Sequence, residues 1–154
     1  MSTSETQEAM GAAMRDFMAY AVLFQDAVAR RAGLNGTDLQ CLSLLIRHGP
    51  MPPGRLAERA GLTAGGAITT VVDRLSGIGL AYRSPDPTDR RRVLVTANAE
   101  EAWTRLAPWY EQVTVRWTRY VDGLLPGQAE VVLGALRAAA EINRDELERL
   151  RGLG

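Results

Sequence analysis

The chain has 154 residues, which fits one domain or one compact subunit of an oligomer. Its 18 basic residues are all arginine and are balanced by 18 acidic residues, so the zero net charge by itself argues weakly against a nucleic-acid-binding protein. No apolar run could span a bilayer and the polar N-terminus has no signal-peptide pattern, so we expect a cytoplasmic protein.

A long helix is predicted over residues 7–32, where apolar residues recur at steps of three and four. At ~1.5 Å per residue this helix would extend about 39 Å, which is long for a domain of this size. We therefore expect part of its apolar stripe to meet another chain. Gly33 and the pair Asn35-Gly36 are expected to end the helix.

A second helix is predicted over residues 37–48. Thr37 and Gln40 have the spacing of a capping box, in which two side chains bind backbone N–H groups at a helix start. Gly49-Pro50 is expected to end this helix.

Two short helices are predicted next, over residues 53–60 and 63–78. Gly61 marks the break between them, and Thr63 is the expected N-cap of the second. Two helices joined by so tight a turn are typical of a helix-turn-helix.

A β-hairpin is predicted after the helix-turn-helix, with strands over residues 80–84 and 92–96. The turn between the strands is rich in proline, aspartate and arginine. A hairpin in this position corresponds to a wing.

The positive charge is concentrated in this part of the chain. Residues 51–96 contain seven arginines and four acidic residues, a charge of +3, whereas residues 1–50 and 97–154 carry −1 and −2. Three successive arginines (Arg90, Arg91 and Arg92) lie in the hairpin. They could form a plain solvated surface, but their position after a helix-turn-helix favours DNA, because an arginine at a wing tip can enter a narrow minor groove.

The rest of the chain is predicted to be helical. One apolar stripe runs from Trp103 to Leu124, with a kink expected near residues 104–107 because Pro108 lies inside the run. A last helix is expected over residues 128–151.

The predicted fold is therefore mainly α with a small β-hairpin wing, that is, a winged helix-turn-helix with long dimerisation helices. Residues 1–154 would form a single subunit, with the DNA-binding module at 37–96 and the dimerisation helices at 7–32 and 98–151. An enzyme is not expected, because the sequence has no phosphate loop and no nucleophile arrangement. One cysteine and one histidine cannot build a Cys/His zinc cage, so no metal or other cofactor is predicted.

Several short motifs, in this order and spacing, resemble the MarR family of winged helix-turn-helix regulators. They are Gly49-Pro50, the stretch from Leu56 to Thr63, the stretch from Val72 to Leu75, Gly79-Leu80, and the stretch from Asp86 to Arg92. The match covers about residues 37–96. The resemblance implies a homodimer with interlocking terminal helices, which presents a recognition helix to a major groove and a wing to the adjoining minor groove.

The resemblance also implies individual roles in DNA binding. Asp89 would orient the guanidinium of Arg91, which would enter the minor groove. The recognition helix would begin at Thr63, and its expected base contacts are Thr69, Thr70 and Arg74. We expect phosphate contacts from further arginines, namely Arg55, Arg83, Arg90 and Arg92. Gly65 and Gly66 either let the backbone approach DNA closely or mark a frayed helix end.

Two further hypotheses concern regulation. The resemblance implies a crevice that takes small aromatic acids or phenols. We expect the protein to be a repressor, and binding of such a ligand would release it from its operator. The candidate lining of the crevice is Tyr20, Phe24, Trp103 and Tyr110, with Arg47 or His48 meeting an anion, although aromatic residues at such helical spacing are usually core or dimer contacts. Cys41 could be a redox-sensing thiol or a buried structural residue. A winged helix that binds protein rather than DNA is the remaining alternative.

Overall fold

The structure, a computed structural model, describes residues 2–62 and 65–152. It is mainly helical with one antiparallel hairpin, as predicted. In chain order the elements are α1 (Thr3–Arg31), α2 (Gly36–His48), α3 (Pro53–Ala60), α4 (Gly66–Gly77), β1 (Ala81–Pro85), β2 (Val93–Ala97), α5 (Ala99–Asp122) and α6 (Gln128–Arg151). The chain divides into two compact units, Met1–Tyr110 and Glu111–Gly154, and α5 contributes to both. Each unit is described by itself.

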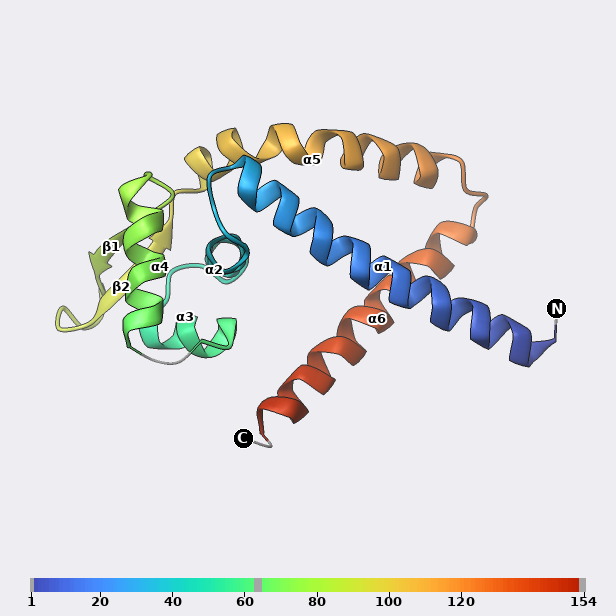
Figure 1. The fold of residues 1–154 in the computed structure, drawn as a ribbon, viewed down its shortest axis with the longest axis horizontal. Coiled ribbons are helices and arrows are strands. Elements are labelled where there is room, and N and C mark those ends of the chain that lie inside the picture. The colour runs from blue at the N-terminus through green and yellow to red at the C-terminus, as the bar shows by residue number, and fades with distance from the viewer. Residues whose placement is uncertain (1, 63–64, 153–154) are drawn as a thin grey trace. The chain divides into compact units, whose positions relative to one another are not determined.

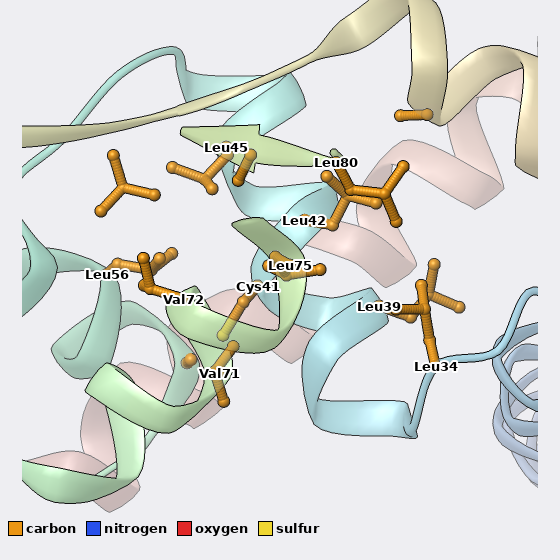
Figure 2. Close-up of a cluster of buried hydrophobic side chains, with 14 of the residues drawn as sticks. Leu34, Leu39, Cys41, Leu42, Leu45, Leu56, Val71, Val72, Leu75 and Leu80 are labelled. Carbon is orange, nitrogen blue, oxygen red and sulfur yellow. The ribbon is translucent and has the colours of Figure 1, made fainter. Parts of the chain in front are cut away.

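In the first unit, α2, α3, α4 and the hairpin gather at the C-terminal end of α1 (Figure 1). Helix α2 packs against α1, α3, α4 and β2, so it is the centre of this module. Figure 2 shows the core that results, in which α2, α3 and α4 direct leucine and valine side chains toward one another. The largest fully buried side chains include Leu42, Leu45, Leu56, Leu75 and Leu80. Burying one such side chain stabilises the fold by roughly 1.5–3 kcal/mol.

The start of α2 differs from the prediction. Its N-cap is Asn35, whose Oδ1 accepts the backbone N–H of Asp38 at 2.8 Å, and the Asp38 carboxylate accepts the backbone N–H of Asn35 at 3.4 Å. The capping box is thus Asn35 with Asp38, and the predicted box of Thr37 with Gln40 was wrong. The error arose because Asn35-Gly36 was interpreted only as the end of α1, whereas an asparagine with an aspartate three residues later is an equally good start.

The hairpin is fixed to the helix-turn-helix by its backbone. Strands β1 and β2 pair antiparallel with Arg83 opposite Val95, and each strand lies one residue later than predicted. Met51, in the link between α2 and α3, donates to the carbonyl of Val95 at 3.1 Å, and the N–H of Val95 donates back at 2.9 Å. The middle of β2 is therefore held by two hydrogen bonds that need no particular side chain.

The long helices leave most of their apolar side chains uncovered. All three long helices lie within the described residues. Helix α1 buries only Val28 and Ala29, and α5 buries only Ala102 and Leu106. Helix α6 buries no residue. Helix α5 continues through Pro108, and the bounds of α6 are those predicted. Across residues 2–62 and 65–152, no helix has the length and apolar character needed to cross a membrane.

Candidate nucleic-acid interface

The start of α4 is an open backbone end. Helix α3 stops at Gly61, whose φ of 67° is left-handed, and α4 begins after Gly65, whose φ of 120° strongly favours glycine. The predicted N-cap, Thr63, lies outside the described residues. No described side chain caps α4, and the N-terminus of a helix is a favourable place for an anion such as a phosphate. Space is open where a Gly66 side chain would project.

Helix α4 turns one face into the core and the other to solvent. Its buried residues are Ile68, Val71, Val72 and Leu75. Thr69 and Thr70, both predicted to contact bases, are exposed on the other face. The hydroxyl of Thr69 donates to the carbonyl of Gly65 at 3.2 Å, and that of Thr70 donates to the carbonyl of Gly66 at 2.9 Å. Both hydroxyl hydrogens are therefore used within the helix.

Arg74, the third predicted base contact, has a partner inside the module. Its Nη2 lies 2.6 Å from Oδ1 of Asp38 and its Nε lies 3.0 Å from Oδ2, so one edge of the guanidinium binds both oxygens of the carboxylate. The Asp38 side chain is 3% exposed and that of Arg74 is 43% exposed. The hydrogen bonds to Asp38 raise the pKa of Arg74. The geometry thus favours a structural role for Arg74, and its contact with DNA stays a prediction.

A second ion pair links α4 to the wing. Nη2 of Arg83 on β1 lies 2.8 Å from Oδ1 of Asp73 on α4, and both side chains are exposed at the surface. The predicted phosphate contact of Arg83 would be made by a guanidinium that already has an acidic neighbour.

The turn of the wing is ordered by local hydrogen bonds. One carboxylate oxygen of Asp86 accepts both the N–H of Thr88 at 2.8 Å and its hydroxyl at 2.7 Å, and these bonds lower the pKa of Asp86. The N–H of Asp86 donates to the carbonyl of Arg92 at 2.9 Å across the loop. These hydrogen bonds together define the backbone conformation of the tip.

Asp89 makes contacts other than the one predicted for it, and its action on the guanidinium of Arg91 stays a prediction. Its carboxylate accepts the backbone N–H of Arg91 at 3.1 Å and lies 3.6 Å from Nε of Arg92, rather than holding the guanidinium of Arg91. Asp89 thus shapes the backbone of the tip. Arg90 and Arg91 are exposed and have no acidic partner within residues 2–62 and 65–152, and the same is true of Arg55 on α3.

The residues predicted for a ligand crevice are only partly brought together. The rings of Phe24 and Tyr110 meet edge to face at 5.5 Å, and the Tyr110 hydroxyl donates to Oε1 of Gln25 at 2.7 Å. Partial burial raises the pKa of Tyr110. Tyr20 and Trp103 are more than two-thirds exposed.

Two more residues, Arg47 and His48, are exposed at the end of α2. A neighbouring contact that the sequence did not suggest places the guanidinium of Arg31 5.8 Å from the ring centre of Trp109. It joins the end of α1 to α5.

Cys41 has the surroundings of a structural residue. It is fully buried on α2, and Figure 2 shows its sulfur between α2 and α4 near Val71 and Leu75. Burial, with a smaller contribution from the charge of Asp38, raises the pKa of the thiol to about 11. A redox-sensing thiol needs exposure and a lowered pKa, so the structure opposes the redox alternative.

Comparison with known proteins gives a consistent result. The model of the MarR family matches residues 34–93. The HTH-type transcriptional regulator YcgE of Bacillus subtilis is 34% identical over 153 residues, which cover 97% of this chain and 96% of the relative. Among solved structures, RV1404 from Mycobacterium tuberculosis has a TM-score of 0.66 at 26% identity, covering 92% of this chain and 94% of that one. MarR from E. coli shares the fold, with a TM-score of 0.58 at 18% identity over 84% of this chain and 94% of that one.

Proposed function

Since the chain belongs to the MarR family of transcriptional regulators, we propose that it represses target genes as a homodimer bound to an inverted-repeat operator. It is a DNA-binding regulator and not an enzyme. Each subunit would place α4 in a major groove and the wing in the adjoining minor groove, with half-sites ~10 base pairs apart, centre to centre. The observation that carries this proposal is the ordered wing tip, where Arg90 and Arg91 lack acidic partners in the described chain.

The wing provides the contact that we assign to the minor groove. Asp89 fixes the backbone at Arg91, and the guanidinium of Arg91 remains free to enter a groove of enhanced negative potential. Arg55, Arg90 and Arg92 are placed to contribute phosphate contacts, so affinity should fall steeply as salt rises. Arg83 would contribute less, because Asp73 offsets its charge.

The proposed dimer is supported by the apolar side chains that the chain leaves uncovered. Met10, Phe17 and Leu23 on α1 are at least half exposed, and so are Ile142 and Leu150 on α6. Exposed apolar surface on this scale is unusual for a monomer. A second copy, related by a two-fold axis, would cover the terminal helices and set the distance between the two recognition helices.

A titration with the DNA that flanks the protein's own gene tests this function. The protein should bind one fragment as a dimer and much more tightly than a scrambled fragment of equal length, with affinity that falls as salt increases. Equal affinity for both fragments at physiological salt would contradict sequence-specific binding. Transcription from the same fragment in vitro distinguishes repression from activation.

Release by a small aromatic ligand is a second proposed function. Phe24 and Tyr110 form an aromatic pair whose hydroxyl is bound to Gln25, and such a mixed surface suits a phenolic ring. A ligand would release DNA only by binding one spacing of the recognition helices better than another. A panel of phenols and aromatic acids should contain a compound that dissociates the operator complex of the wild type, with a weaker effect on Tyr110→Phe. No response to any compound in the panel would count against it.

A further inference from the structure

We infer that α4 recognises thymine methyl groups, so that each half-site carries A·T base pairs opposite Thr69 and Thr70. This inference rests on the proposed function, because it names the feature of the operator that the recognition helix reads. The exposed face of α4 carries two sets of groups: those that are already bound within the protein, and those that remain for contact with DNA.

The charged residues of α4 are already paired. The helix contains only two, Asp73 and Arg74, and they pair with Arg83 and Asp38. An arginine reads guanine by donating two parallel hydrogen bonds from its guanidinium. In Arg74, Nε and Nη2 form such an edge, and both donate to Asp38. Reading guanine through that edge would leave a buried carboxylate without its partner, which is costly.

Other side chains that read bases through paired hydrogen bonds are absent from α4. The sequence Gly66–Gly77 has no lysine, asparagine or glutamine. The usual two-bond recognition of adenine by an amide side chain is therefore not available to this helix. The exposed face has only small side chains in its first two turns, including Ala67, Thr69 and Thr70.

The two threonines offer methyl groups and acceptor oxygens. Each hydroxyl hydrogen is donated to the carbonyl four residues earlier, so donation to O6 or N7 of guanine would first have to break that bond. The methyl groups of these two exposed side chains form no hydrogen bond and are left for apolar contacts. An A·T pair is the base pair that displays a methyl group and an amino donor in the major groove, and it matches both remaining groups.

The start of α4 allows these short side chains to reach the bases. Gly65 and Gly66 have no side chains, and among residues 2–62 and 65–152 no further atom lies within 4 Å of where their Cβ atoms would be. The backbone can therefore approach the DNA more closely than a helix that begins with larger residues. This distance matters because a threonine methyl extends little beyond its own helix.

The test begins with the full-length protein and a pool of random duplex DNA, from which the preferred operator is selected. Each thymine of that operator is then replaced by deoxyuridine, which removes only the 5-methyl group. We expect a loss of about 3–5-fold in affinity at one or two positions of each half-site, as expected for removing one buried methyl contact. Substitution in the flanking DNA should have no effect.

Variants of the protein identify the partner of each methyl. Thr70→Ser keeps the hydroxyl and its hydrogen bond but removes the methyl, so it should weaken binding by a similar factor and abolish sensitivity to deoxyuridine at its position. Thr69→Ser should do the same at a neighbouring position. Thr88→Ser in the wing is the matched control, because the minor groove displays no thymine methyl, and its deoxyuridine profile should equal that of the wild type.

The outcomes separate this inference from the function beneath it. A selected operator that is bound tightly but shows a flat deoxyuridine profile, or G·C pairs at the positions protected by α4, would overturn methyl recognition and leave operator binding intact. Failure to select any sequence would overturn operator binding and, with it, this inference. Thermal unfolding of each variant shows whether the fold is retained.

Discussion

Arg74 near the end of α4 binds the buried carboxylate of Asp38 at the start of α2 through the Nε and Nη2 edge of its guanidinium. The same carboxylate also accepts the backbone N–H of Asn35. One side chain thus closes the capping box of the central helix and fixes the position of the recognition helix. A residue that the family resemblance assigned to DNA is, in the folded chain, placed to hold α4.

The first prediction concerns this ion pair. Arg74→Ala should lower the free energy of unfolding by about 2–3 kcal/mol, because it leaves a buried carboxylate without its cation; the partial exposure of Arg74 makes the loss smaller than for a fully buried pair. Asp38→Asn should cost less than Asp38→Ala, because its side-chain oxygen can still accept the N–H of Asn35. Urea denaturation of all three variants checks the order. Weaker operator binding by Arg74→Ala with unchanged stability would instead make Arg74 a DNA contact.

The second prediction concerns the wing tip. Arg91→Ala should weaken operator binding by ~1–3 kcal/mol if its guanidinium enters the minor groove, and the loss should depend on the base pairs beneath the wing. Arg90→Ala should weaken binding to all sequences by a similar amount, because a phosphate contact carries no sequence information. Fluorescence anisotropy with operators that differ only under the wing measures both. Identical sequence dependence for the two variants would contradict the assignment of Arg91 to the minor groove.

The third prediction concerns Cys41. Burial stabilises the protonated thiol, so the folded state holds this proton more tightly than the unfolded state does. The resulting contribution to stability is complete below pH 9 and is lost as the pH rises toward 11, by roughly 2–3 kcal/mol. Between pH 8 and 11 the free energy of unfolding should therefore decline more steeply for the wild type than for Cys41→Ala. The variant keeps all of the tyrosines, so it controls for their titration in the same pH range. Rapid reaction of the native thiol with a thiol reagent at pH 7 would contradict its burial.

The fourth prediction concerns the proposed dimer. Leu136→Glu places a charge on the apolar stripe of α6 and should shift the protein toward monomer, with loss of operator binding. Ala138→Glu is the matched control, since it introduces the same charge about 200° around the helix. Sedimentation analysis at several concentrations distinguishes the two. A stable Leu136→Glu dimer would exclude this part of α6 from the interface.

Much of the secondary structure could be predicted from the sequence. The bounds of α3 and α6 agree with the spacing of their apolar residues and their flanking glycines, and the strands are displaced by one residue. These elements depend on local patterns. The start of α2 was placed too late because two overlapping capping signals lie within six residues, and nothing local decides between them.

The site was harder to predict, because it depends on pairs of residues that are far apart in the chain. Asp38 and Arg74 are separated by 36 positions, and no local pattern links them, although an aspartate beside the buried Leu39 is a signal that the carboxylate needs a partner. The wing arginines were found because they are consecutive. Which of them would lack a partner depends on the turn made by Asp86 and Asp89, and only the structure provides that.

The backbone bridge between Met51 and Val95 has a consequence for how this regulator could change in evolution. Both hydrogen bonds use main-chain atoms, so most substitutions in the wing leave the bridge in place. Mutations at the tip can then alter which DNA is bound while the tip keeps its position beside the recognition helix. A lineage of duplicated genes could in this way acquire new operators through single substitutions, each tested by selection on an unchanged scaffold.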